Sequence, residues 1–197
     1  MANGCNIAAP ENIHGLYSLI AKQPTHMPAR RERICVFISH KDADTLAAIE
    51  IGNHIMQDLG LDVYLDVYDK SLQRADEDGD LEGIVASIQK GVSYASHLLC
   101  VISDKSKDSW WMPYEIGFAQ ANGVNTASII VKNTEYLPTY LRVKESPVFS
   151  DIEAFDSYMA GFMGYGGLFT HDIGITMPHE FEYFNIREER EYGIHKE

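Results

Sequence analysis

Long apolar runs and basic residues are both scarce in this sequence of 197 residues. A membrane-spanning helix needs about eighteen or more consecutive apolar residues, and no such run occurs, so we expect no contact with a membrane. The 16 Lys and Arg are outnumbered by 29 Asp and Glu, which gives a net charge of −13. This balance argues against nonspecific binding to nucleic acid or to anionic membranes. A small anionic substrate stays possible, because one helix N-terminus can hold a phosphate.

Cysteine is also rare. The three cysteines are odd in number, and Cys35 and Cys100 lie inside apolar runs, which predicts reduced core residues. The N-terminus has no basic stretch followed by an apolar core, so no secretory signal is predicted and a cytoplasmic location is expected. The glycine-rich dinucleotide and phosphate loops and the Gly-x-Ser-x-Gly motif are absent as well.

The sequence does contain short apolar, β-branched runs that alternate with helix-like segments. Strands are predicted at residues 34–38, 63–65, 98–102 and 127–131, with a weaker one at 148–149. Helices are predicted from Asp42 or Asp44 to Leu59, after a cap at Asp80, and around Glu115. Residues 66–80 are expected to form a long acidic loop. This alternation predicts an α/β fold with a parallel sheet covered by helices on both faces.

Ligands of such sheets bind outside the carboxyl ends of the strands. Residues 39–42, 66–80 and 103–115 lie at that edge. Backbone N–H groups there and the hydroxyl of Ser39 could hold a ribose or a phosphate. The acidic run 76–80 does not fit a calcium loop, because its sixth position would be Leu81 rather than glycine. The histidines of the C-terminal segment have no ligand spacing, so no metal site is predicted.

Residues 109–119, Ser-Trp-Trp-Met-Pro-Tyr-Glu-Ile-Gly-Phe-Ala, carry the strongest functional signal. Pro113 suits the first turn of a helix, and Glu115 would lie in that same turn. There it could be a carboxylate that favours the helix N-terminus, or a catalytic group. Trp111 precedes Glu115 by four residues, so both face the same side of the helix. One of Trp110 and Trp111 is expected to pack in the core.

This segment, together with Val36-Phe37-Ile38-Ser39-His40-Lys41-Asp42-Ala43-Asp44, resembles TIR domains of the NAD-cleaving kind over roughly residues 33–155. The resemblance implies a flavodoxin-like TIR fold with about five parallel strands and helices on both faces. It also implies that Glu115, in the Trp-x-x-x-Glu pattern, is the catalytic glutamate. The substrate-binding residues that it implies are Phe37, Ile38, Ser39, Asp42, Tyr68, Ser71, Trp110 and Trp111.

The resemblance divides the chain into three parts. Residues 33–160 form the TIR domain, and residues 1–32 form an N-terminal extension with a short amphipathic helix around Ile13 to Ile20. Residues 161–197 form a C-terminal extension that packs on the domain or flanks it.

The implied activity is that of an NAD+ glycohydrolase or ADP-ribosyl cyclase. NAD+ would be the substrate, so no cofactor is expected. Homo-oligomers through TIR–TIR contacts and a downstream effector, reached through the nucleotide product, are the implied partners. The chain is similar in this respect to the TIR sensors of the bacterial Thoeris antiphage system.

Two other functions fit the same residues. Nucleoside deoxyribosyltransferases share the fold and a Glu-x-Gly-x-Ala segment, here residues 115–119, in which the glutamate is the nucleophile. A TIR domain can also be an interaction module that binds partners without turnover. Glu115 in register with Trp111 favours activity, and the two tryptophans favour NAD+ over a deoxynucleoside.

Overall fold

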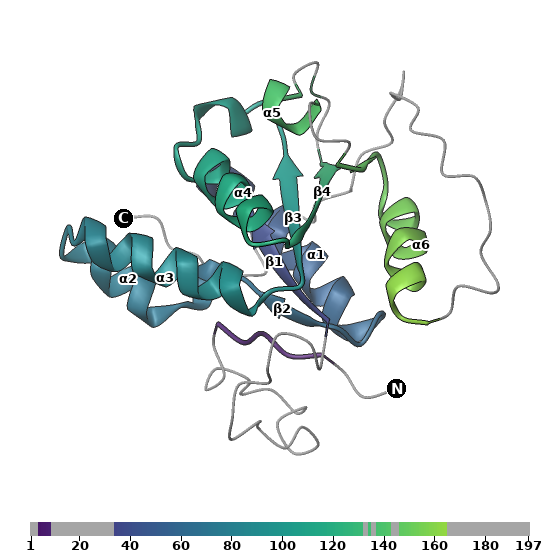
Figure 1. Cartoon of the computed structure of the whole chain (residues 1–197), viewed down its shortest axis with the longest axis horizontal. Coiled ribbons are helices and arrows are strands. Elements are labelled where there is room, and N and C mark those ends of the chain that lie inside the picture. Colours follow the sequence, from purple (N-terminus) through teal and green to yellow (C-terminus); the bar gives the residue numbers. More distant parts are fainter. Residues whose placement is uncertain (1–3, 9–33, 132–133, 135–136, 143–145, 165–197) are drawn as a thin grey trace.

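The computed structural model describes residues 4–8, 34–131, 134, 137–142 and 146–164. Its centre is a five-stranded sheet with the strand order β2-β1-β3-β4-β5, in which every pairing is parallel (Figure 1). The strands are β1 (Cys35–Ser39), β2 (Asp62–Tyr64), β3 (His97–Ile102), β4 (Asn125–Ile130) and β5 (Val148–Phe149). This is the flavodoxin-like order, so the predicted fold class is confirmed.

Two layers of helices cover the sheet because successive residues of each strand point to opposite faces. On one face, Phe37 and Cys100 pack with α2 (Lys70–Glu77), α3 (Leu81–Tyr94) and α4 (Trp111–Ala121). On the other face, Ile38 and Leu99 pack with α1 (Thr45–Gln57) and α6 (Ile152–Phe162). The remaining helical segments are short: η1 (Asp42–Asp44), η2 (Asp66–Tyr68), η3 (Ser106–Asp108) and α5 (Thr139–Arg142).

The predicted acidic loop at residues 66–80 is wrong, because most of it is helical. Asp69 caps α2 by accepting hydrogen bonds from the N–H groups of Ser71 and Leu72. Leu72 and Ala75 then pack against the core, while Asp76, Glu77 and Asp78 are exposed. The expected cap of α1 is also wrong, since the Asp44 side chain bonds no helix N–H and instead accepts a 2.5 Å hydrogen bond from Ser103 Oγ. Asp80, in contrast, caps α3 as predicted.

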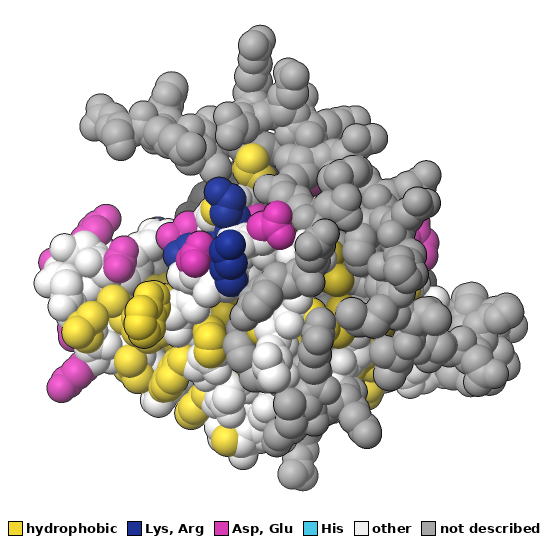
Figure 2. Space-filling view, turned by 90° about the horizontal axis from the view of Figure 1, so that it is seen from above, with side chains coloured by type: hydrophobic (Ala, Val, Ile, Leu, Met, Phe, Trp, Pro, Cys, Tyr) yellow, Lys and Arg dark blue, Asp and Glu magenta, His cyan; other side chains and the backbone are white. Residues whose placement is uncertain are grey.

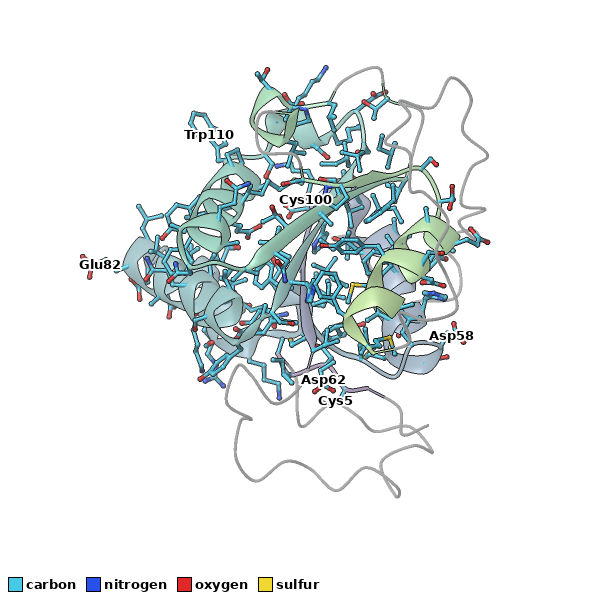
Figure 3. The ribbon with its side chains drawn as sticks, turned by 45° about the vertical axis from the view of Figure 1, so that its right-hand side comes forward. Cys5, Asp58, Asp62, Glu82, Cys100 and Trp110 are labelled. Atoms are coloured by element: carbon cyan, nitrogen blue, oxygen red, sulfur yellow. The ribbon has the colours of Figure 1, made fainter. Side chains whose placement is uncertain are left out.

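The N-terminal segment adds to the free side of β2. Val63 donates its N–H to the carbonyl of Cys5, and Ile7 donates to the carbonyl of Val63. Cys5 therefore lies beside Asp62 at the amino end of the sheet (Figure 3). The short helix predicted around residues 13–20 and the glycine-rich and acidic tail beyond residue 164 lie outside the described residues. Cys35 and Cys100 are buried and reduced, as predicted.

Gly91 provides a test of the packing under β1 and β2. A Cβ at this position of α3 would lie 2.5 Å from Tyr64 Cε1 and 2.9 Å from Phe37 Cε2, and these two rings stack on each other. We expect Gly91→Ala to lower the free energy of unfolding by roughly 1–3 kcal/mol, as overpacking does. Gly117→Ala in α4 is the matched control, because nothing lies within 4 Å of its Cβ position. The control should raise stability by about 0.5–1 kcal/mol through helix propensity. Urea denaturation measures both, and equal effects of the two variants would contradict the packing argument.

Candidate active site

A buried hydrogen bond joins the end of β1 to α4. Ser39 Oγ donates to Glu115 Oε2 over 2.5 Å, and both residues are buried, with Glu115 only 4% exposed. Glu115 lies one turn inside α4, since the helix begins at Trp111 and its first turn has no acidic residue. In the first turn, the backbone N–H of Met112 instead donates a hydrogen bond to Ser109 Oγ. The capping explanation of Glu115 is therefore wrong.

Burial sets the protonation of Glu115. It raises the pKa of this carboxyl from an ordinary value of 4.5 to about 8, and the charge of Asp66 acts in the same direction, while the hydrogen bond from Ser39 acts against it. In the free protein at neutral pH this carboxyl is therefore mostly protonated. A cation that arrives beside it would favour the ionised form, so the charge of this group responds to what occupies the site.

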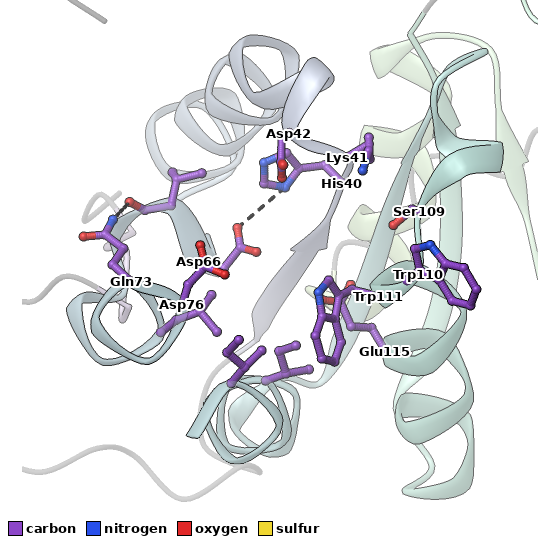
Figure 4. Close-up of a pocket in the computed structure, with 14 residues that line it drawn as sticks. His40, Lys41, Asp42, Asp66, Gln73, Asp76, Ser109, Trp110, Trp111 and Glu115 are labelled. Atoms are coloured by element: carbon purple, nitrogen blue, oxygen red, sulfur yellow. Dashed lines mark hydrogen bonds and ion pairs between the residues drawn. The ribbon is translucent and has the colours of Figure 1, made fainter. Parts of the chain in front are cut away.

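A pocket of about 350 Å³ opens above this pair at the carboxyl edge of the sheet (Figure 4). Its volume lies in the range typical of small-molecule sites. Apolar side chains of α2 and α3 line one part, among them Leu72, Ile84 and Ile88. In the view onto this edge of the sheet, hydrophobic and acidic side chains lie side by side where α2 and α3 reach the surface (Figure 2).

The two tryptophans stand at the mouth of the pocket, and neither packs in the core. Trp110 is 90% exposed and projects away from the body of the domain (Figure 3). Trp111 is 39% exposed, lies beside Glu115 and meets Tyr114 edge to face at 6.2 Å between ring centroids. The expectation of one buried tryptophan is thus wrong. Both are aromatic surfaces that a ligand can cover.

The remaining predicted substrate residues divide into two groups. Ser39 contacts Glu115 directly, and Asp42 lines the pocket. Phe37 is buried under the stacked ring of Tyr64, and Ile38 is buried on the opposite face of the sheet beneath α1. Neither of these two side chains lines the pocket.

Tyr68 and Ser71 also lie away from the pocket lining. Tyr68 is at the surface in η2, and the hydroxyl of Ser71 donates to Asp69 over 2.5 Å within the cap of α2. Ser71 therefore supports the helix that walls the pocket.

The sequence placed residues 39–42 and 66–80 at this edge and offered His40 as a possible ligand, but it did not predict that His40 and Asp66 meet in the pocket. His40 directly follows β1, and Asp66 follows the segment that contains β2. Their positions after neighbouring strands were the available signal. Among the described residues no cluster of His, Cys, Asp and Glu could hold a metal ion. No helix in the same residues is long and apolar enough to cross a membrane.

A TIR domain family model matches residues 36–160. A curated relative from Bacillus cereus (strain MSX-D12), "Probable 3' cyclic ADP-D-ribose synthase ThsB'", is 29% identical over 106 residues, or 53% of each chain. The chain thus spans about half the length of this relative. Among solved structures, the TIR domain of the Toll-related receptor TRR-2 from Hydra magnipapillata aligns with 65% of this chain and 94% of its own, at 12% identity and a TM-score of 0.49.

The raised pKa of Glu115 predicts how stability depends on pH. Between about pH 4.5 and pH 8 the folded protein holds a proton that the unfolded chain has lost, so this group's contribution falls as the pH rises. Glu115→Gln keeps an acceptor for Ser39 but does not titrate. We therefore expect the variant's melting temperature, relative to wild type, to rise steadily from about pH 5 to about pH 9.

Glu153→Gln is the control for this experiment, because Glu153 is exposed on α6. Its melting temperature should follow that of the wild type across the same range. A constant difference between Glu115→Gln and the wild type at every pH would contradict the buried, protonated state.

Proposed function

The chain belongs to the TIR domain family, and from that premise we propose that it cleaves NAD+ between nicotinamide and ribose and converts the remainder into a cyclic ADP-ribose. One observation carries the proposal. A glutamate is buried at the base of a pocket, at the carboxyl edge of the sheet, beside an exposed aromatic surface.

The nicotinamide leaving group needs no proton from the protein. Nicotinamide leaves as a neutral molecule, since the electron pair of the broken bond neutralises its pyridinium nitrogen, and no general acid is needed. Positive charge then develops on the ribose. Glu115 would stabilise that charge as carboxylates do in glycoside cleavage. The pyridinium of bound NAD+ would itself draw Glu115 into the ionised form, so the negative charge appears when the substrate is present.

Trp111 supplies the second requirement, which is a wall for the nicotinamide end. An indole face attracts a cationic ring, and the attraction is stronger when water is excluded. Trp111 is close enough to Glu115 to line the same pocket and exposed enough to be covered by a ligand. NAD+ is consumed as substrate in this scheme, so no further cofactor takes part.

A cyclic product requires a group of the substrate itself to attack before water does. Such an intramolecular attack has a very large effective concentration when the substrate is held folded. The name of the Bacillus cereus relative, a 3' cyclic ADP-D-ribose synthase, supports this outcome over simple hydrolysis. We further propose that the product activates a downstream effector in antiphage defence, as the resemblance to Thoeris TIR sensors implies. The TIR family match favours NAD+ over the deoxynucleoside of the alternative enzyme.

The direct test is Glu115→Gln with NAD+. Nicotinamide release should fall by about a hundredfold or more, because removing one electrostatic stabiliser of a transition state costs that much. Mass spectrometry identifies the product: loss of nicotinamide alone means cyclisation, and a further gain of water means hydrolysis. Glu153→Gln should retain the wild-type rate. Wild-type turnover by Glu115→Gln would contradict the assignment of Glu115.

The pH dependence of the rate gives a second test. The ionised carboxyl is the active form, and the free protein holds its proton up to about pH 8. We expect kcat/KM to rise with pH and to level off above about pH 8, since this ratio reports the pKa of the free enzyme. Initial rates in matched ionic strength from about pH 6 to pH 9.5 measure it. A flat profile would show that Glu115 does not need to lose its proton.

A further inference from the structure

Two buried polar atoms face each other in the pocket without a hydrogen-bond partner. They are His40 Nδ1 and Asp66 Oδ1, which lie 3.7 Å apart, too far for a hydrogen bond (Figure 4). The side chain of His40 is only 3% exposed. Because buried polar groups in proteins are almost always bonded, such a pair marks a position where a ligand atom belongs.

The neighbours of His40 determine which of its nitrogens is free to accept a proton. Thr45 Oγ1 donates its hydrogen to the carbonyl of Asp42 over 2.8 Å, so towards His40 it can only accept. His40 Nε2 lies 3.3 Å from this oxygen and must therefore carry the N–H. In neutral His40 the lone pair is then on Nδ1, on the side of Asp66 and the pocket.

We propose that His40, supported by Asp66, binds a ribose hydroxyl of NAD+ and removes its proton as that hydroxyl closes the cyclic product. The inference rests on the proposed function. The bond from the ribose carbon to nicotinamide breaks, and its electron pair leaves on the nicotinamide nitrogen. The hydroxyl oxygen forms the new bond to the same carbon. Its proton moves to His40 Nδ1, and the Asp66 carboxylate stabilises the imidazolium that results.

The presence of a base identifies the attacking group as a hydroxyl. An adenine ring nitrogen has no proton to lose when it attacks, so a site for that reaction needs no base. A hydroxyl does lose one, and a positioned base contributes about a hundredfold or more to such a step. Burial raises the pKa of Asp66 while His40 lowers it, which suits a carboxylate whose charge depends on its histidine partner.

The two halves of the reaction then have separate groups. Glu115 comes from α4, whereas His40 and Asp66 follow the ends of β1 and β2 and stand on another side of the pocket (Figure 4). Loss of nicotinamide depends on Glu115, and the choice of the attacking group depends on the histidine pair. Changing the pair should therefore alter the product more than the rate.

The experiment measures nicotinamide, cyclic ADP-ribose and linear ADP-ribose after incubating the full chain with NAD+. In His40→Gln and in Asp66→Asn we expect the ratio of cyclic to linear product to fall at least tenfold, because a positioned base contributes that much or more to the attack of the hydroxyl. Asp104→Asn removes a charge from an exposed turn after β3 that does not line the pocket, and it should keep the wild-type ratio. Melting temperatures establish that each variant is folded. If only one of the two pair variants folds, that variant alone tests the proposal.

The outcomes separate the two proposals. A wild-type protein that releases nicotinamide, with an unchanged product ratio in both pair variants, overturns the role of the pair and leaves NAD+ cleavage intact. A wild type that yields only linear ADP-ribose overturns the role of the pair as well. A wild type that releases no nicotinamide overturns the proposed function, and the inference with it.

Discussion

The site depends on one buried hydrogen bond, from Ser39 to Glu115, which joins residues 76 positions apart in the sequence. It forms only if the end of β1 and the second turn of α4 meet inside the protein. Met112, Ile116 and Ala119 bring that about, because they pack the buried side of α4 against the sheet. The same helical register leaves Trp111 at the mouth of the pocket. The same contacts of α4 therefore determine both the packing of the core and the position of the Glu115 carboxyl.

The buried position of Glu115 costs stability but serves the proposed reaction. An ionised carboxylate would be costly in a buried position, so the folded protein keeps Glu115 protonated up to about pH 8. A leucine there would remove this cost and also remove the buried carboxyl from the pocket. In the proposed reaction the cationic substrate makes ionisation favourable. The substrate thus supplies part of the electrostatic stabilisation that the free protein lacks.

Sequence reasoning located the strands and Glu115 because their signals are local: continuous apolar runs, and the Trp-x-x-x-Glu pattern. It failed where contacts between residues far apart in the sequence determine the local structure. Helix α2 has few apolar residues, and it forms because Asp69 caps it and because Leu72 and Ala75 pack on the core. The exposure of both tryptophans depends on which side of α4 meets the sheet. The pairing of His40 with Asp66 requires β1 and β2 to be neighbours, which the strand order decides.

That strand order also explains why the pocket lies where it does. In the order β2-β1-β3-β4-β5, the chain leaves β1 into α1 on one face of the sheet and leaves β3 into α4 on the other. Connections that depart to opposite faces open a crevice between the two strand ends, which is where open α/β sheets bind ligands. His40 follows one strand and Glu115 follows the connection from the other. The two groups that we propose to act on NAD+ therefore come from connections that leave the sheet on opposite faces, and the end of β1 links them, because Ser39 bonds Glu115 and His40 is the next residue.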